Sequence, residues 1–341
     1  MVTRDDVARL AGTSTAVVSY VLNNGPRPVA EATRQRVLAA VEQLGYRPNG
    51  VARSLRAQRT RVLALIVPDI SNPYFAQLAR DVEDVAFGRG YTVVIGNSIG
   101  DIGRELVYVR TFVESRVDGL LYISAGKSSH AVDELIRSKV PTVVLDRRVP
   151  GFDASSVTAD NRGGAQLATQ HLIDHGHRRI AFLGGPSKFS AAAERRRGWS
   201  SRLRQAGLAS DRSLIVRAAF DRKTAYRAAL SVLDRPNRPT ALFAAADEQG
   251  IGALRAAYEL GLRVPDDLAV ASFDGVVDAS YTVPSLTGVR QPVRAMAARA
   301  LEILLGLVHG DDAEPVHEVF PVELILRGSC GCPEPTAEQP A

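Results

Sequence analysis

The sequence lacks any apolar run long enough to cross a membrane. Hydrophobic residues make up 45% of its 341 residues, but no stretch reaches the length of a transmembrane helix, about eighteen consecutive apolar residues. The N-terminus begins with charged residues rather than with an apolar signal segment. We therefore expect a cytoplasmic protein without a membrane partner.

Cysteine is scarce. The two cysteines, Cys330 and Cys332, stand near the C-terminus in the sequence Ser-Cys-Gly-Cys-Pro. Two ligands cannot complete a structural zinc site, and a disulfide between residues this close would be strained. We therefore expect no metal, no cofactor and a flexible tail around the cysteines. Residues 331–341 are predicted to be disordered, because the last of them are rich in Pro, Glu and Ala.

The sequence also lacks the usual signatures of catalysis. Residues 68–73 form the turn Pro-Asp-Ile-Ser-Asn-Pro after the first buried stretch, without the glycines that let a dinucleotide approach the backbone. No P-loop, nucleophile elbow, metal-ligand cluster or paired acid–base set is evident in the sequence. The six histidines are scattered along the chain, at His130, His171, His175, His177, His309 and His317. The protein is therefore not expected to be an enzyme.

Positive charge is concentrated near the N-terminus. Residues 1–61 contain ten arginines and four acidic residues, a net charge of +6, whereas residues 62–341 carry a net charge of −1. Because 38 of the 42 basic residues are Arg, a bias that genome composition can produce, the informative feature is where the charges lie. A basic terminal segment is what binding to nucleic-acid phosphates requires.

Residues 3–44 have the pattern of three short helices. Thr3 and Ser14 are suited to cap the first two helices, and Gly12 and Gly45 are suited to end the first and the third. The apolar faces are expected to be Val7, Leu10 and Ala11, then Val17, Val18, Val21 and Leu22, then Val37, Leu38, Val41 and Leu44. The pattern predicts an all-α helix-turn-helix DNA-binding domain over residues 1–47.

These motifs resemble the LacI/GalR family of transcriptional repressors, and the resemblance runs nearly end to end. The matching stretches are DVARLAG at residues 6–12, VS followed by VLN within residues 18–23, LGYRPN at residues 44–49 and VARSLR at residues 51–56. Their combination is far more specific than a lone helix-turn-helix match. The resemblance implies a homodimer that binds a roughly palindromic double-stranded DNA operator. It also implies that operator affinity changes when a small-molecule effector binds the larger domain.

The start of the second helix is expected to read base edges, as recognition helices in the major groove do. In the family's pattern, Thr15 and Ala16 occupy two variable base-reading positions, and Tyr20 occupies a third that is often Arg. Ala16 can offer only apolar contact, and Tyr20 cannot make the bidentate guanine contact of Arg. A phosphate contact or plain packing therefore stays open for Tyr20. The other predicted contacts in this domain, mostly to phosphate, are Thr3, Ser14, Ser19, Asn23 and Arg27.

Residues 48–60 are predicted to form a hinge helix and linker. Such a short helix is marginal in water by itself, and in the family it forms when two copies pair on DNA. The family's Leu at the position of Leu55 wedges into the central base step of the minor groove, which kinks the duplex; packing within the linker is the alternative for Leu55. The predicted DNA contacts of this segment are Asn49, Ala52, Arg53 and Leu55.

From residue 61 onwards, apolar strands alternate with amphipathic helices. This alternation predicts parallel sheets flanked by helices, and two series of strands predict two α/β lobes. The predicted strands are residues 62–67, 91–95, 119–123, 142–145, 179–183, 240–244 and 268–273, with a helix at 73–87.

The resemblance implies a two-lobed, periplasmic-binding-protein-like effector-binding and dimerisation domain over residues 61–330. Lobe one is expected to comprise about 61–160 and 291–319, and lobe two about 161–289 and 320–330. The chain would cross between them near residues 159–162, 289–291 and 318–322.

Polar and aromatic residues at the strand ends are the candidate effector site, because ligands of such folds bind at the carboxyl ends of the strands. The resemblance places contacts at six positions, and Tyr74 adjoins one of them. The predicted set is Asp69, Tyr74, Phe75, Asp146, Arg195, Phe220 and Asp274. Carboxylates and a guanidinium suit vicinal hydroxyls, and aromatic faces suit a sugar ring. We therefore expect a sugar or sugar-like effector.

Other roles stay open for individual residues. Asp69 could cap the helix near Pro73, Tyr74 and Phe75 could belong to the core, and Asp247 could cap its own helix. Trp199 is expected to pack against its own helix. Arg195 and Asp274 are favoured as ligand contacts because a salt bridge across an open cleft would be costly.

The effector and the activity also have alternatives. Ala246 stands where the family often has Asn, which argues for a different or differently oriented ligand. A nucleoside- or purine-responsive, corepressor-dependent regulator is one alternative. A sugar- or nucleoside-acting enzyme with a DNA-binding head is another, which turnover of a candidate ligand would support. A sugar-binding transport receptor is excluded, because it would have no basic helical head.

Overall fold

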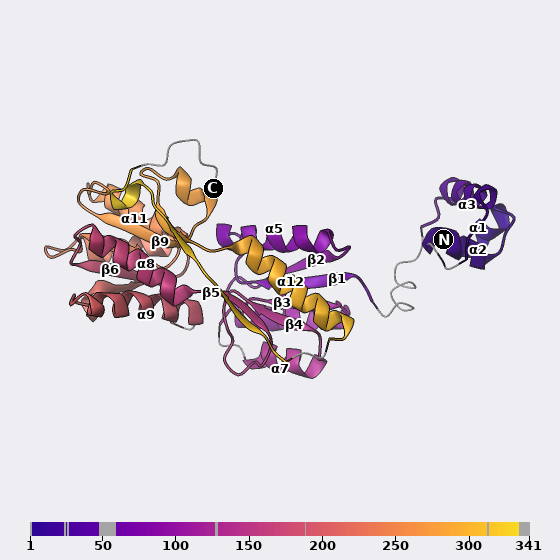
Figure 1. The fold of residues 1–341 in the computed structure, drawn as a ribbon, viewed down its shortest axis with the longest axis horizontal. Coiled ribbons are helices and arrows are strands. Elements are labelled where there is room, and N and C mark those ends of the chain that lie inside the picture. The colour runs from indigo at the N-terminus through magenta and orange to yellow at the C-terminus, as the bar shows by residue number, and fades with distance from the viewer. Residues whose placement is uncertain are drawn as a thin grey trace. The chain divides into compact units, whose positions relative to one another are not determined.

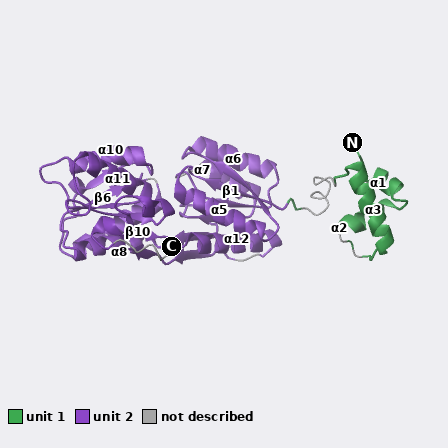
Figure 2. Cartoon of the chain, turned by 90° about the horizontal axis from the view of Figure 1, so that it is seen from above, with its two compact units in different colours: residues 1–60 green, residues 61–341 purple. Residues whose placement is uncertain are grey.

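The computed structural model describes residues 2–23, 25, 27–47, 59–126, 129–187, 189–311 and 314–333. The chain divides into two compact units, residues 1–60 and residues 61–341 (Figure 2). The predicted contacts Asn49, Ala52, Arg53 and Leu55 lie outside the described residues, as does most of the predicted hinge segment. Among the described residues, no helix is long and apolar enough to span a bilayer.

The first unit consists of three helices, α1 (Arg4–Leu10), α2 (Thr15–Asn23) and α3 (Glu31–Leu44). The predicted caps are confirmed. The Thr3 hydroxyl accepts a hydrogen bond from the Asp6 backbone N–H while the Asp6 carboxylate accepts one from the Thr3 N–H, which satisfies two free donors of α1. Ser14 Oγ accepts from the Val17 N–H at 3.3 Å. Gly45 ends α3 in the left-handed conformation, with φ at 60°.

The core of this unit corrects two predicted apolar positions. Val7, Val18 and Val37 are fully buried, but Leu10 is 47% exposed and Leu38 is 38% exposed. The inward positions on these helices are taken by small residues instead, with Ala8, Ala11 and Ala40 all buried. Small side chains at these positions let the helix backbones approach one another closely, and the larger leucines lie at the edge of the interface.

The second unit contains two lobes, each built on a six-stranded sheet (Figure 1). The sheet of lobe one has the order β11-β5-β4-β3-β1-β2 and is parallel throughout. Its elements are β1 (Val62–Val67), α5 (Pro73–Phe87), β2 (Thr92–Asn97), α6 (Ile102–Glu114), β3 (Gly119–Tyr122), α7 (Ser129–Ser138), β4 (Thr142–Leu145), β5 (Ser156–Ala159), α12 (Val293–His309) and β11 (His317–Phe320).

The sheet of lobe two has the order β12-β10-β9-β8-β6-β7, and β12 is its antiparallel edge strand. Its helices and strands are α8 (Asn161–Asp174), β6 (Ile180–Gly184), α9 (Ser190–Gln205), β7 (Ile215–Arg217), α10 (Arg222–Leu233), β8 (Ala241–Ala244), α11 (Asp247–Glu259), β9 (Ala269–Asp274), β10 (Thr287–Arg290) and β12 (Glu323–Ile325). Three short 3-10 helices complete it: η1 (Arg212–Leu214), η2 (Val277–Tyr281) and η3 (Gly328–Cys330).

The chain crosses between the lobes three times: from β5 to α8, from β10 to α12 and from β11 to β12. Lobe one therefore contains a helix and a strand from the distant C-terminal region, and β11 pairs in parallel with β5. The predicted strands are all present, and the bounds of β1, β4 and α5 match the prediction residue for residue.

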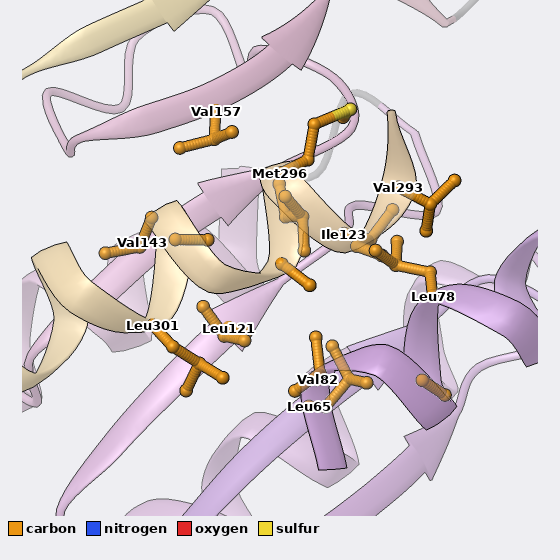
Figure 3. Close-up of a cluster of buried hydrophobic side chains, with 14 of the residues drawn as sticks. Leu65, Leu78, Val82, Leu121, Ile123, Val143, Val157, Val293, Met296 and Leu301 are labelled. Atoms are coloured by element: carbon orange, nitrogen blue, oxygen red, sulfur yellow. The ribbon is translucent and has the colours of Figure 1, made fainter. Parts of the chain in front are cut away.

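The core of lobe one shows how a distant segment completes the domain. Met296 and Leu301 of α12 are fully buried against the sheet residues Leu121 and Val143 (Figure 3). Helix α5 joins the same cluster through Leu78 and Val82. Burying large apolar side chains contributes about 1.5–3 kcal/mol each, so α12 is held in place by the face that it covers.

Trp199 is the largest fully buried side chain of lobe two. As predicted, it is a packing residue and not a ligand face. Its partner differs from the prediction, because the ring stacks on Phe182 of β6, at 5.5 Å between centroids, rather than only on its own helix.

Candidate DNA-binding face and effector site

The start of α2 presents exposed side chains from an electropositive helix end. Thr15 and Ala16 are exposed, and the first turn of α2 contains no acidic residue. The N-terminus of a helix carries a partial positive charge that favours anions. Arg27, in the loop after α2, is also exposed. These residues have the exposure that contact with a duplex requires.

The other predicted contacts of this unit are partly occupied by local structure. Tyr20 is half-buried, and its ring lies so close to Gly25 that a Cβ at Gly25 would collide with it. This supports the packing alternative for Tyr20. Thr3 and Ser14 serve as helix caps, and Ser19 is half-buried. Asn23 is the last residue of α2, and its side chain lies outside the described part of the chain.

In the second unit, two aspartates at strand ends have strained backbones. Asp146 follows β4 with φ at 69°, and Asp274 ends β9 with φ at 125°. Residues other than glycine in this region cost about 1–3 kcal/mol each and cluster at ligand-binding sites. Both carboxylates are buried. The surrounding contacts, which include an ion pair for each carboxylate, must offset this strain at the strand ends.

Arg195 of α9 is the centre of the polar network in lobe two. Its Nη1 lies 3.2 Å from Asp274 Oδ1, and its Nε donates to Asn161 Oδ1 at 2.7 Å. Its guanidinium carbon lies 3.7 Å from the centre of the Phe273 ring. The predicted pair is thus brought together, but both partners belong to lobe two. The argument that favoured them as ligand contacts, the cost of a salt bridge across an open cleft, therefore does not apply to this buried pair.

The ends of this network reach two of the lobe crossings. Asn161 begins α8 directly after the first crossing, and it accepts the hydrogen bond from Arg195. Gln291, in the second crossing, donates through Nε2 to Asp274 Oδ1 at 2.9 Å and accepts from the Tyr74 hydroxyl at 3.2 Å. The Arg195–Asp274 pair is therefore hydrogen-bonded to residues at two of the three connections between the lobes.

Burial changes the protonation of these groups. It raises the pKa of Asp274 to about 7, against the opposing effect of Arg195, and it raises the pKa of Asp247 to about 6. Burial also raises the pKa of Tyr74 well above its usual value, with Asp146 and Asp274 adding to the shift. The nearby charges of Asp247 and Asp146 add to the rise in the pKa of Asp274.

The raised pKa of Asp274 predicts a pH dependence of stability. The stabilisation from its protonated form is complete below the ordinary value of 3.8 and is lost as the pH rises through about 7. The free energy of unfolding of the wild type should therefore fall, relative to that of Asp274→Asn, between about pH 4 and pH 8. Urea denaturation at several pH values measures this difference. Asp278→Asn, at a half-exposed position, is the control. An equal pH dependence of stability for Asp274→Asn and the wild type would contradict the raised pKa of Asp274.

Aromatic rings from both lobes surround a second buried arginine. The guanidinium of Arg147 lies 5.5 Å from the ring centre of Phe75 in lobe one and 4.4 Å from that of Phe189 in lobe two. Phe189 in turn lies 5.9 Å from Phe220. Arg147 Nε also pairs with Asp146 Oδ2 at 2.8 Å. Phe75, Asp146 and Phe220 are thereby brought into one interlobe cluster with two residues that were not predicted.

Two alternatives for acidic residues are wrong. Asp69 does not cap α5, because Asn72 is the N-cap and accepts from the Tyr74 N–H at 3.0 Å. Asp69 instead accepts two hydrogen bonds from Ser71 in its own turn. Asp247 does not cap α11 either. It is the first residue of the helix, and its carboxylate accepts from the Ser272 hydroxyl and, at 2.7 Å, from the Val276 N–H.

Tyr74 and Phe75 belong to the core, as one alternative for them predicted, and each also contacts a polar residue outside it. Both are buried members of the core cluster of lobe one, with exposed fractions of 3% and 6%. Yet the Tyr74 hydroxyl reaches Gln291 and the Phe75 ring faces Arg147. Both rings therefore pack in the core of lobe one, while the Tyr74 hydroxyl and the Phe75 ring also contact residues of the polar site.

Sequence reasoning missed Arg147, Phe189, Asn161 and Gln291. Arg147 adjoins the predicted Asp146, and a charged residue directly after a buried strand was a usable signal. Asn161 and Gln291 lie in the predicted crossings, so their positions were available although their contacts were not. Phe189 follows β6 across a short loop and carried no signal that separated it from other apolar residues.

The C-terminal segment also differs from the prediction. Cys330 ends η3 and is only 1% exposed, so it is not part of a flexible tail. The sequence suggested only two possible zinc ligands here. The structure brings His171 and His175, at the C-terminal end of α8, beside Cys330 and Cys332. Two of the histidines that are scattered in the sequence therefore lie together with both cysteines.

Comparisons with known proteins match this arrangement. Residues 3–49 match the model of bacterial regulatory proteins of the lacI family, and residues 169–330 match a periplasmic binding protein-like domain. The HTH-type transcriptional repressor PurR of Photobacterium profundum is 36% identical over 331 residues, covering 96% of this chain and 98% of that protein. The chain belongs to the LacI family of bacterial regulatory proteins.

Solved structures of LacI-family regulators have the same fold. A lac repressor dimer bound to operator and the anti-inducer ONPF superposes with a TM-score of 0.87 at 28% identity, covering 96% of this chain and 99% of that one. The transcriptional regulator CelR in complex with cellobiose gives a TM-score of 0.74 at 33% identity, covering 96% and 100%. The protein is thus a LacI-family transcriptional repressor with a helix-turn-helix unit and a two-lobed effector domain.

Proposed function

We propose that this LacI-family repressor binds a two-fold symmetric operator as a homodimer and that a sugar-like effector, held between its lobes, controls its operator affinity. The observation that carries the proposal is the network around Arg195 and Asp274. It combines charged hydrogen-bonding groups with the aromatic ring of Phe273, and it is bonded to residues at two lobe crossings.

The effector would contact Asp69, Tyr74, Phe75, Asp146, Arg195, Phe220 and Asp274. Forked guanidinium groups and carboxylates bind vicinal hydroxyls, and aromatic faces bind the apolar side of a sugar ring. A ligand that binds one arrangement of the lobes better than another shifts their equilibrium. Operator affinity then changes only by that difference in binding.

The class of effector is open to a direct test. One similar structure contains cellobiose, which supports a saccharide, whereas the relatives named PurR support a purine. Calorimetric titration of the purified protein with cellobiose, monosaccharides, purine bases and nucleosides separates the two. Saccharide binding that changes operator affinity supports the proposal. Purine binding with the same effect would replace the sugar by a purine corepressor and leave the regulatory role intact.

Exposed apolar side chains on lobe two support a homodimer. Tyr258, Tyr281 and Val283 are 76%, 82% and 96% exposed, and Tyr258 and Val283 line one depression with Leu254 and Pro284. Exposed apolar groups of this kind mark interaction surfaces. The solved lac repressor on its operator is a dimer.

The operator itself is predicted to be palindromic. Selection of random duplex DNA by the purified protein, at about 150 mM salt because phosphate binding depends on salt, should enrich a two-fold symmetric consensus. The proposed contacts are Thr3, Ser14, Thr15, Ala16, Ser19, Tyr20, Asn23, Arg27, Asn49, Ala52, Arg53 and Leu55. The enrichment should collapse for Leu55→Ala, which removes the proposed wedge. Enrichment of an asymmetric site, or an unchanged consensus with Leu55→Ala, would contradict the dimeric hinge mechanism.

A further inference from the structure

Four potential metal ligands meet at the end of α8. His171 lies in its last turn, His175 is its C-cap residue, and Cys330 and Cys332 come from the C-terminal segment. One ligand atom from each residue, two imidazole nitrogens and two sulfurs, can be chosen so that all four lie within 4.8 Å of one another. Both cysteines are free thiols rather than partners in a disulfide.

The separations between Cys332 and the two histidines match those of a tetrahedral zinc site. Zn–S bonds of about 2.3 Å and Zn–N bonds of about 2.0–2.1 Å place sulfur and nitrogen ligands about 3.6 Å apart. Cys332 Sγ lies 3.6 Å from His171 Nε2 and 3.6 Å from His175 Nε2. Cys330 Sγ lies 3.1 Å from His171 Nε2, closer than the two ligands of a zinc ion would be, and the remaining separations are within 4.8 Å.

The backbone explains why these side chains converge. His171 and His175 are four residues apart, so both project from one face of the helix, and their ring centres are 4.5 Å apart. Between the cysteines, Gly331 has φ at 94°. This left-handed conformation, which suits glycine, reverses the chain within one residue and directs both sulfurs toward the helix.

The surroundings of the cluster favour a bound cation. Thr287 Oγ1 lies 3.0 Å from Cys330 Sγ and donates to it, as groups around metal-bound thiolates do. The carbonyl end of α8 carries a partial negative charge, which stabilises a nearby positive ion. Cys330 is buried, whereas His175 is exposed, so an ion could enter from the solvent side.

We propose that His171, His175, Cys330 and Cys332 bind one zinc ion in a structural Cys2His2 site. Two sulfur and two nitrogen ligands are a set that favours tetrahedral coordination and zinc among the common divalent ions. Four protein ligands leave no open position for a substrate, so the ion has a structural role. It fastens the segment after the third lobe crossing to the helix that follows the first, and thereby ties two connections together within lobe two.

Metal analysis and cobalt substitution test this proposal. Untagged protein purified without chelator should contain one zinc per chain by elemental analysis. After chelation, Co(II) should give the visible bands of a tetrahedral thiolate complex. The double variant Cys330→Ser/Cys332→Ser should lose both signals. His177→Gln is the matched control, because His177 lies two residues beyond His175 but pairs with Thr240, and it should retain both.

A readout of stability distinguishes structural binding from loose binding. Chelation should lower the Tm of the wild type and restoring zinc should raise it again, because an ion that binds only the folded state stabilises it. The Cys variant should show no response. Should that variant fail to fold, the cobalt titration of the wild type still decides. Wild-type protein that takes up no Co(II), or that gives bands without thiolate character, would overturn the proposal.

Discussion

Replacing Arg195 by Met should destabilise the effector domain by about 3–5 kcal/mol, because it breaks a buried ion pair and leaves its partner charge uncompensated. The variant removes the guanidinium from Asp274, Asn161 and the Ala245 carbonyl at once. Urea denaturation followed by fluorescence measures the loss. The only tryptophan, Trp199, lies on the same helix, so its emission reports on lobe two.

The same helix provides a control for this prediction. Arg197 is 62% exposed and pairs with Glu194 within one turn of α9. Arg197→Met should change the free energy of unfolding by less than about 0.5 kcal/mol, because exposed ion pairs contribute little. Equal losses for the two variants would mean that the buried pair has no special role in stability.

Arg195→Met should also abolish effector binding under conditions where the variant stays folded. The loss in the free energy of unfolding that Arg195→Met causes should be larger at pH 8 than at pH 6, since Asp274 is mainly ionised only above its pKa of about 7. Calorimetric titration at about 15 °C, where the loss of stability matters least, measures the binding. Retained binding with undiminished affinity would remove Arg195 from the proposed effector site.

The second large effect is expected in the helix-turn-helix unit. Val7→Ser should cost about 2–4 kcal/mol, because it leaves a cavity and buries a hydroxyl in a core of eight buried residues. Domains of this size have little stability to lose. Operator binding should therefore fall by about a hundredfold or more, since each 1.4 kcal/mol is about tenfold. Effector binding should persist, because the second unit is separately compact.

Leu10→Ser is the matched control for Val7→Ser. Both positions are on α1, but Leu10 is 47% exposed whereas Val7 is fully buried. The control should unfold at nearly the wild-type temperature and keep operator binding. Fluorescence anisotropy with a labelled operator measures affinity, and circular dichroism measures helix content. A comparable loss of stability and operator binding in Leu10→Ser would contradict the prediction, because it would mean that the burial of Val7 and the exposure of Leu10 do not describe the folded helix-turn-helix unit.

The long elements of this fold could be predicted from the sequence because each one is specified locally. β1 is a run of six apolar residues, Val62–Val67, followed by a Pro–Asp turn, and α5 begins with Pro73 directly after an Asn cap. These signals need no information about the rest of the chain. The same holds for the capping box of Thr3 and Asp6 and for the left-handed Gly45.

Features that depend on distant partners could not be predicted in the same way. The short strands β11 and β12 have only four and three residues, and their strand conformation is stabilised by pairing with β5 and β10. The proposed zinc ligands include residues that are 159 positions apart in the sequence, His171 and Cys330. For the effector site, the strand-end residues could be predicted, but the pairing of Arg195 with Asp274 inside one lobe could not.

The placement of β11 and β12 has a consequence for synthesis on the ribosome. Each is an edge strand, one in each sheet, and both lie within the last 25 residues of the chain. Until they emerge, the backbones of β5 and β10 keep one unpaired side, which is a template for association with other chains. Neither lobe can complete its sheet before β11 and β12 have been synthesised, so a nascent chain that stalls before residue 317 would expose two unpaired sheet edges together.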